Sequence, residues 1–178
     1  DSKLGALADC ENLIPLYQKS FDEKKGDITW VKRAVGRMFN KGCTDDPLFR
    51  KLFEAQLALE PSASAYLYGG TLKAKDGDNK GAIADFDKAA ELETDARKKS
   101  DILYKSATIA RKFSKSQARS YANKAIQANS SNGKAYLLIA NLYASSANDC
   151  GSTPFEKRAV YWLAADMARK AARGEIRH

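Results

Sequence analysis

One acidic stretch has the residue types and the spacing that could hold calcium. In KAKDGDNKGAIADFDKA, Asp76, Asp78, Gly81 and Asp87 fall at the first, third, sixth and twelfth positions of a calcium-binding loop. The fifth position is Lys80, which offers no oxygen ligand, and the twelfth lacks the usual bidentate glutamate. The same stretch could instead be the elbow between two antiparallel helices, with Asp78 capping the second helix. We favour the elbow and expect no metal.

The titratable residues form no recognisable catalytic constellation. The only histidine is His178, the last residue, so a Ser-His-Asp triad or a histidine-rich zinc site cannot form. Aspartate, glutamate and lysine are plentiful, but none of them falls in a catalytic motif. We therefore expect a protein that is not an enzyme and that uses no cofactor.

The three cysteines, Cys10, Cys43 and Cys150, lie far apart and show no CxxC spacing, which argues against a zinc site. Cys10 lies at the start of one expected helix, and Cys43 follows the end of the next, antiparallel helix. Each helix has about fourteen residues, or about 21 Å, so the two sulfurs come to the same end of the hairpin. Two alternatives remain, a Cys10–Cys43 disulfide or two separate thiols. A disulfide would indicate an oxidising compartment, whereas Cys150 has no evident partner.

Composition narrows the class of protein. The chain has 178 residues and a net charge of +8, which suits nucleic acid, an anionic surface or acidic partners. Basic residues are spread along the chain and mixed with acidic ones, so solvated helix faces are the simpler interpretation. No apolar run is long enough to span a membrane, and the first ten residues lack the pattern of a signal peptide.

Small and bulky residues recur at helical spacing. Gly70, Gly77, Ala82, Phe86 and Ala89 let two helices approach closely, with the phenylalanine filling the space between them. The frame recurs at Gly36 and Phe39, at Ala118, Ala122 and Ala125, and at Tyr136, Ile139, Ala140 and Tyr143. This pattern resembles the tetratricopeptide repeat (TPR) family. Ala82 and Ala118 are 36 residues apart, close to the roughly 34 residues of that repeat.

The resemblance implies an all-α fold, a right-handed superhelical solenoid that forms a single array over residues 1–178. A leading helix is expected at 11–24, followed by about four helix pairs at 28–59, 63–93, 97–128 and 133–173. Within the pairs we expect helices at 28–42 and 47–59, 63–76 and 79–93, 97–113 and 116–128, and 133–146 and 154–173. Stacked pairs of this family leave one concave face.

The resemblance also implies where a ligand sits, because first helices line the concave groove. The residues carried over to the groove are Trp30, Arg33, Arg37, Asn40, Lys41, Leu67, Thr71, Lys75, Leu103, Ala107, Arg111, Lys134, Leu137 and Asn141. The groove would be basic, with Trp30 as an anchor, and would take a protein or peptide with acidic groups, since arginine binds carboxylates with a forked pair of donors.

A second resemblance concerns the cysteine-containing segments. CTDDPLF and NDCGSTPFEKRAVYWLAADMARKAAR look like stretches of TPR-containing envelope proteins of Bacteroidota-type bacteria. This implies a periplasmic, secreted or membrane-attached location. The YWLAADMARKAAR helix could serve as an amphipathic partner or membrane helix, but we favour ordinary packing roles for Tyr161, Trp162 and Met167.

The function expected from these features is a non-enzymatic scaffold that binds a protein or peptide through a basic concave groove. The alternative is a nucleic-acid-binding helical repeat, which the net charge would suit. That alternative is disfavoured because Tyr66, Tyr68, Tyr136 and Tyr143 fall largely on packing positions, which leaves no stacking platform for bases.

Overall fold

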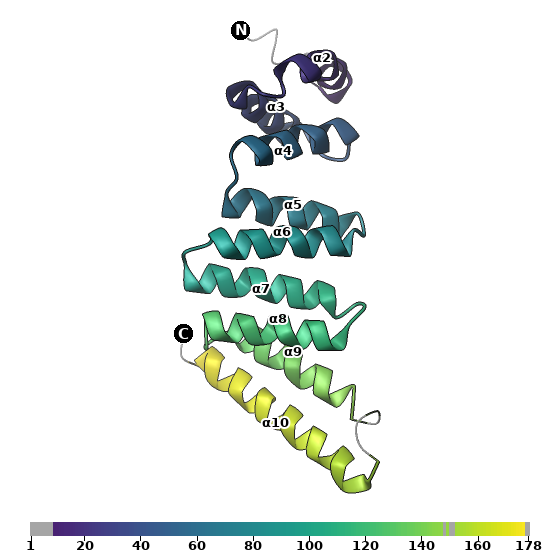
Figure 1. Ribbon diagram of the computed structural model, residues 1–178, viewed down its shortest axis with the longest axis vertical. Coiled ribbons are helices and arrows are strands. Elements are labelled where there is room, and N and C mark those ends of the chain that lie inside the picture. Colours follow the sequence, from purple (N-terminus) through teal and green to yellow (C-terminus); the bar gives the residue numbers. More distant parts are fainter. Residues whose placement is uncertain (1–8, 148, 150–151, 177–178) are drawn as a thin grey trace. The chain divides into compact units, whose positions relative to one another are not determined.

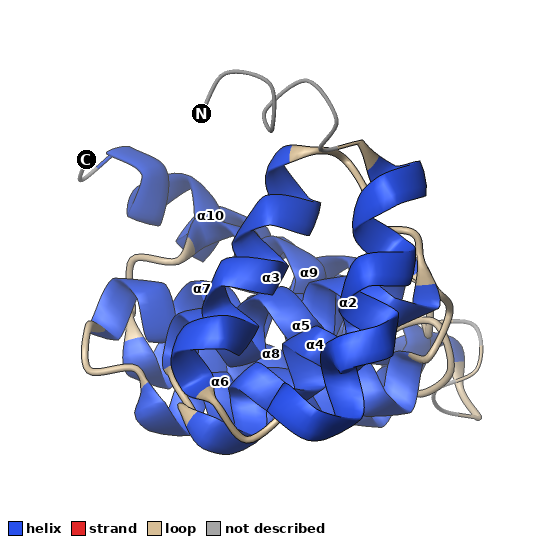
Figure 2. Cartoon of the chain, turned by 90° about the horizontal axis from the view of Figure 1, so that it is seen from above, coloured by secondary structure: helices blue, strands red, loops and turns tan. Residues whose placement is uncertain are grey.

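The computed structural model describes residues 9–147, 149 and 152–176. Over these residues all regular structure is helical, with no strand (Figure 2). The helices are α2 Cys10–Lys24, α3 Ile28–Asn40, α4 Pro47–Leu59, α5 Ala63–Lys75, α6 Asn79–Leu92, α7 Ala96–Ala110, α8 Lys115–Ala128, α9 Gly133–Ala144 and α10 Pro154–Ile176. The expected all-α class is therefore confirmed. None of these helices, over the part of the chain described, is long and apolar enough to cross a bilayer.

Contacts within the chain define two compact units, Asp1–Ala65 and Tyr66–His178, called unit 1 and unit 2 below. Unit 1 holds α2, α3 and α4, and unit 2 holds most of α5 together with α6 to α10.

Polar side chains set where most of the helices begin. An N-cap side chain that accepts a first-turn N–H stabilises a helix by about 0.5–2 kcal/mol. Such caps precede α2, α3, α4, α6, α7, α8 and α9, and they are Asp9, Asp27, Asp46, Asp78, Asp95, Ser114 and Asn132. The expected cap at Asp78 is confirmed, because its Oδ1 accepts from the Gly81 N–H at 2.9 Å.

The acidic stretch around Asp78 forms an elbow. Helix α5 ends at Lys75, and Gly77 adopts a φ of 85°, a left-handed conformation that glycine adopts at little cost. Asp87 lies inside α6, where its Oδ2 accepts from the Tyr121 hydroxyl at 2.7 Å. The favoured interpretation of this stretch therefore agrees with the structure.

Unit 1 is built around α3 and α4 and is closed by a covalent link. Cys10 and Cys43 form a disulfide with Cα atoms 5.5 Å apart, which is the first of the two alternatives that the sequence left open. Cys150 lies outside the described residues. The buried side chains of unit 1 are Leu13, Tyr17, Val31, Ala34, Met38, Cys43, Leu48, Phe49, Leu52, Phe53, Leu57 and Ala65.

In unit 2 the helices α6, α7, α8, α9 and α10 stack in chain order (Figure 1), each contacting the next, and α7 also contacts α9. The core between them is rich in alanine, including Ala82, Ala89, Ala118, Ala122 and Ala125, all with no exposed surface. Small side chains allow helices to approach closely, so the expected repeat frame is confirmed at these alanines. Gly77, which was assigned to the same close contact, lies in the elbow instead, with nothing within 4 Å of an added Cβ.

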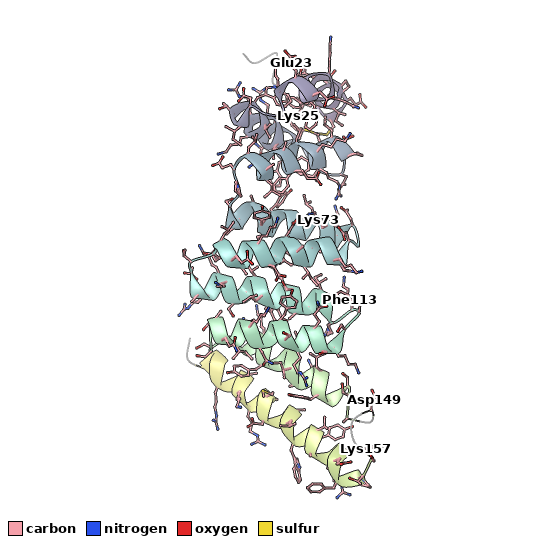
Figure 3. All side chains as sticks on the ribbon, viewed as in Figure 1. Glu23, Lys25, Lys73, Phe113, Asp149 and Lys157 are labelled. Carbon is pink, nitrogen blue, oxygen red and sulfur yellow. A yellow bond between two sulfur atoms is a disulfide. The ribbon has the colours of Figure 1, made fainter. Side chains whose placement is uncertain are left out.

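The contact between α5 and α6 shows the frame most clearly. A Cβ atom added at Gly70 would lie 2.7 Å from ring atoms of Phe86 and 3.0 Å from the Ala82 carbonyl oxygen. An ion pair of 2.7 Å joins the same two helices, from Lys73 (labelled in Figure 3) to the nearly buried Asp85.

The frame is wrong in the first predicted pair. Gly36 has no atom within 4 Å of an added Cβ, and Phe39 is 53% exposed. The side of α3 that packs instead carries Val31, Ala34 and Met38, which are fully buried. The apolar stripe of this helix is therefore rotated from the expected positions.

A buried polar network joins three elements of unit 2. The Ser100 hydroxyl of α7 donates to the Ala125 carbonyl of α8 at 2.7 Å. The Asn132 side-chain amide donates to that hydroxyl at 2.8 Å, and its Oδ1 accepts from the Ala135 N–H at the start of α9. Buried polar groups are costly unless paired, so this network favours one arrangement of the three helices.

Candidate functional site

The residues proposed for the groove in unit 1 lie on α3 and its C-terminal end. Trp30 is half-buried, with its ring edge-on to Tyr17 of α2 at 5.7 Å between centroids. The Arg37 guanidinium donates to the Tyr17 hydroxyl at 3.5 Å. Arg33, Asn40 and Lys41 are exposed. Helix α2 thus holds two of the five residues, while the others face solvent.

Four of the residues proposed for the groove in unit 2 are exposed, whereas Leu67 is partly buried against the core. Thr71 and Lys75 lie on α5, Arg111 follows α7, and Asn141 lies on α9. We call these four residues the first-helix stripe. The Thr71 hydroxyl donates to the Leu67 carbonyl oxygen at 2.8 Å, so it is held by its own helix.

Two of the other residues carried over to the groove are misplaced. Leu103 is 8% exposed and Ala107 fully buried, because this side of α7 packs into the core. The exposed positions of α7 include Asp101, Lys105 and the following Arg111. On α7 the residues assigned to the groove are therefore rotated by part of a helical turn from the exposed side. On α9 the assigned residues Lys134 and Leu137 are exposed.

The exposed sides of the first helices in unit 2 carry mainly positive charge. Lys75, Lys105, Arg111 and Lys134 are exposed there, against two exposed carboxylates, Asp101 of α7 and Asp76, which follows α5. Clustered cations raise the local concentration of acidic groups and speed their association. This side of unit 2 is chemically suited to an acidic segment.

A cavity of about 570 Å³ lies elsewhere in unit 2, between α6 and α8 over α7. Asp87 and Glu91 line one wall, and Lys99 and Lys124 line the others. Burial first, and then the hydrogen bond and charge of Asp87, raise the pKa of Tyr121, so its hydroxyl remains a donor near neutral pH. The lining of this cavity carries two carboxylates, Asp87 and Glu91, and two ammonium groups, Lys99 and Lys124. The cavity therefore does not extend the basic surface.

Sequence reasoning missed an apolar surface on α10. Trp162 is 63% and Tyr161 is 49% exposed, so the packing roles expected for them are wrong; Met167 does pack against the core. Phe155 is also exposed and meets Trp162 edge-on, with ring centroids 6.2 Å apart. The spacing of the apolar residues along α10 does contain the information that predicts this surface. Ala164 and Ala171 mark the buried side, and Phe155 and Trp162, also seven residues apart, mark the opposite side.

Groups of metal ligands are absent from the described part of the chain. No cluster of three or more histidine, cysteine, aspartate or glutamate side chains there has a geometry that could hold an ion. His178 lies outside the described residues.

Comparison with known proteins establishes the fold alone. No family model matches the chain, and no curated protein matches it. Two crystal structures of MamA are similar. One has a TM-score of 0.64 at 17% identity, covering 94% of this chain and 91% of that one. The other has a TM-score of 0.62 at 19% identity, covering 91% and 80%. The expected all-α, helical-repeat fold is confirmed.

Proposed function

We propose that this chain is a non-enzymatic scaffold that binds an acidic protein or peptide segment on the exposed sides of its first helices. The observation that supports this most directly is the basic surface of α5, α7 and α9 in unit 2, where Lys75, Arg111 and Lys134 are exposed. Arginine and lysine form charge-assisted hydrogen bonds with carboxylates, which are about twice as strong as neutral ones.

In unit 1 the proposed contacts are Arg33, Asn40 and Lys41 of α3, with Trp30 and Arg37 held beside Tyr17. A guanidinium fixed by a neighbouring hydroxyl has less freedom to lose when a carboxylate binds. Unit 1 would thus supply a second, separately testable set of basic contacts.

The proposed location is an oxidising compartment, such as a bacterial cell envelope. The Cys10–Cys43 disulfide supports this, because disulfides persist outside the reducing cytosol. Expression in the periplasm and in the cytosol of a laboratory host provides the test. Free-thiol counts should show the pair oxidised in the periplasm and reduced in the cytosol, and a pair that stays oxidised in the cytosol would remove this support for the location.

Charge reversal tests the binding surface. Fluorescence anisotropy with a labelled Asp- and Glu-rich peptide pool should show binding that Lys75→Glu with Arg111→Glu weakens about tenfold or more. Lys80→Glu, an exposed lysine of the second helix α6, is the matched control and should leave binding unchanged. Equal binding by a Lys-rich pool would contradict the proposal.

Nucleic-acid binding has less support. Tyr66 and Tyr143 pack against the core, and their rings lie beneath Lys88 and Arg119 at 5.2 and 5.8 Å. Bases need uncovered aromatic faces for stacking. Binding of single-stranded RNA that falls steeply with salt, in a protein that does not bind the acidic peptide pool, would favour this alternative.

A further inference from the structure

The N-terminal half of α10 exposes an unusual amount of apolar surface. Phe155 is 68%, Trp162 63% and Leu163 48% exposed. Phe155, Ala159 and Leu163 are four residues apart, so they form one row along the helix, and the Trp162 ring meets the Phe155 ring edge-on. Isolated exposed apolar residues are normal, but a continuous patch marks an interaction site.

This row borders a cleft of about 260 Å³ between α8 and α10. The apolar lining is Leu142 and Tyr143 of the α9 helix, with Val160 and Leu163 of α10, and Lys115 and Arg119 of α8 line it with charge. Small-molecule pockets usually measure about 300–1,000 Å³, so this cleft is better suited to side chains of a docked segment. We call the row and the cleft together the α10 surface.

Positive charge borders the α10 surface. Arg119 lies over the Tyr143 ring, and no carboxylate of the described residues lies within ion-pair distance of Arg119, Lys157 or Arg158. Lys157 lies at the same end of the α9–α10 pair as Asp149 (Figure 3).

The nearby carboxylates already have partners. Asp149 lies 3.8 Å from Lys115, and Asp166 lies 2.9 Å from Lys170. Glu156 accepts from the Ser152 and Thr153 N–H groups. The surface therefore offers apolar contacts and uncompensated cations, but little negative charge.

We infer that the α10 surface docks an amphipathic helix of a partner protein, one that carries acidic residues beside its apolar stripe. The occupant is assigned by complementarity. Apolar side chains spaced as on a helix would enter the cleft and cover Phe155 and Trp162, and carboxylates beside them would meet Arg119 and Arg158. Helix-in-groove docking through anchors at i, i+3, i+4 and i+7 is a common mode of recognition.

Two other occupants fit the surface less well. An anionic membrane would match the aromatic and basic residues, but a flat lipid surface would not enter the cleft that Val160 and Leu163 line. A second copy of the chain would bring together molecules of net charge +8, which repel each other. This surface is also distinct from the first-helix stripe, because Leu142 and Tyr143 lie on other sides of α9 than Leu137 and Asn141.

The test uses the full chain carrying Trp30→Phe, in which Trp162 is the only tryptophan. A display library of random peptides of about 16 residues, about four helical turns, is selected against this protein. Enriched peptides are synthesised and titrated while Trp162 emission is recorded. We expect them to combine apolar residues at helical spacing with Asp or Glu, and to shift the emission to shorter wavelength.

The variants include matched controls. Leu163→Asp should weaken binding of the enriched peptides about tenfold or more, whereas Leu92→Asp, at a leucine of α6 that is 49% exposed, should not. Arg119→Glu should weaken the acidic peptides about tenfold, whereas Lys80→Glu, at an exposed lysine of α6, should leave them unchanged. Circular dichroism confirms that each variant is folded.

Several results would overturn the inference. They are enrichment of basic peptides, no enrichment over a Leu163→Asp bait, and equal loss of binding in Leu92→Asp. A Trp162 shift with phosphatidylserine vesicles but not with peptides would indicate a membrane surface instead. A shift that grows with the concentration of the chain alone would indicate a second copy. Loss of acidic-peptide binding only in Lys75→Glu with Arg111→Glu would remove this inference while leaving the proposed function standing.

Discussion

Gly70 and Gly36 are both helical glycines, yet their surroundings differ completely. An added Cβ at Gly70 would meet Phe86 and the Ala82 carbonyl oxygen, whereas at Gly36 nothing lies within 4 Å. We expect Gly70→Ala to lower the free energy of unfolding of unit 2 by about 1–3 kcal/mol, the usual cost of overpacking. Gly36→Ala should raise the stability of unit 1 by about 0.5–1 kcal/mol, because alanine favours helix. Urea unfolding of each variant measures both; a harmless Gly70→Ala would contradict the close approach.

Glu156 makes the start of α10 sensitive to acid. Its carboxylate accepts from the Thr153 and Ser152 N–H groups, and these bonds, together with the Thr153 hydroxyl, lower its pKa below 4.5. Because the pKa is lower in the folded state, the ionised carboxylate stabilises the fold above pH 4.5, the ordinary pKa of the group. This stabilisation is lost as the pH falls through the folded pKa. We expect amide exchange in the first turn of α10 to quicken over that range.

The control for this prediction is Glu156→Gln. Glutamine can keep the capping interaction but does not titrate, so exchange in the first turn should become independent of pH once intrinsic rates are removed. NMR titration of wild-type protein reports the pKa directly. A carboxylate that titrates at or above 4.5 would show that the cap does not form.

At the scale of the helices, two buried serines of α7 provide a matched comparison. Ser100 and Ser106 are both fully buried, but Ser100 bridges Ala125 and Asn132, whereas the Ser106 hydroxyl has no partner among the described residues. Ser100→Ala should cost about 1–3 kcal/mol, because it leaves buried groups unpaired. Ser106→Ala should be neutral or stabilising. Thermal unfolding distinguishes them, and equal effects would exclude the network as a source of stability.

Much of the helix arrangement could be predicted because spacing alone determines which side chains share a face. Gly70, Ala82 and Phe86 revealed the close contact in unit 2 through size and period. The prediction that Gly36 and Phe39 pack was wrong, because one glycine and one aromatic residue do not show which side of α3 faces the core. The network at Ser100 was not predictable, since it depends on a hydroxyl meeting a carbonyl 25 residues later in the chain.

The candidate site was less predictable than the fold. Exposed cations at Lys75 and Arg111 followed from the repeat frame, but Leu103 was assigned to the groove although it packs in the core. The α10 surface was missed because aromatic residues usually pack, and spacing does not reveal whether a neighbouring helix covers them. Only the position of α9 on one side of α10 shows that Phe155 and Trp162 face away from it.

At the scale of the molecule, the Cys10–Cys43 disulfide lies wholly within unit 1. The disulfide closes a loop with a sequence separation of 33 within unit 1. A loop of that length gives about 3–4 kcal/mol in the chain-entropy account. We expect Cys10→Ser with Cys43→Ser to lower the stability of unit 1 by up to that amount and leave unit 2 unchanged.

Calorimetry combined with limited proteolysis measures the stability of each unit in the double variant. Early cleavage should be confined to residues before Tyr66 in the double variant, and wild-type protein treated with a reductant should behave in the same way. Equal destabilisation of both units would show that they do not unfold separately.

The same link governs how the molecule responds to a mechanical load. When the chain is pulled from both ends, the residues between Cys10 and Cys43 are bypassed by the sulfur bridge, so a stretch with a sequence separation of 33 cannot extend. At roughly 3.5 Å per residue this withholds about 115 Å of contour length. In an optical trap, full extension should lengthen by about that amount once a reducing agent is added, so this protein's reach under tension is set by the redox state of its surroundings.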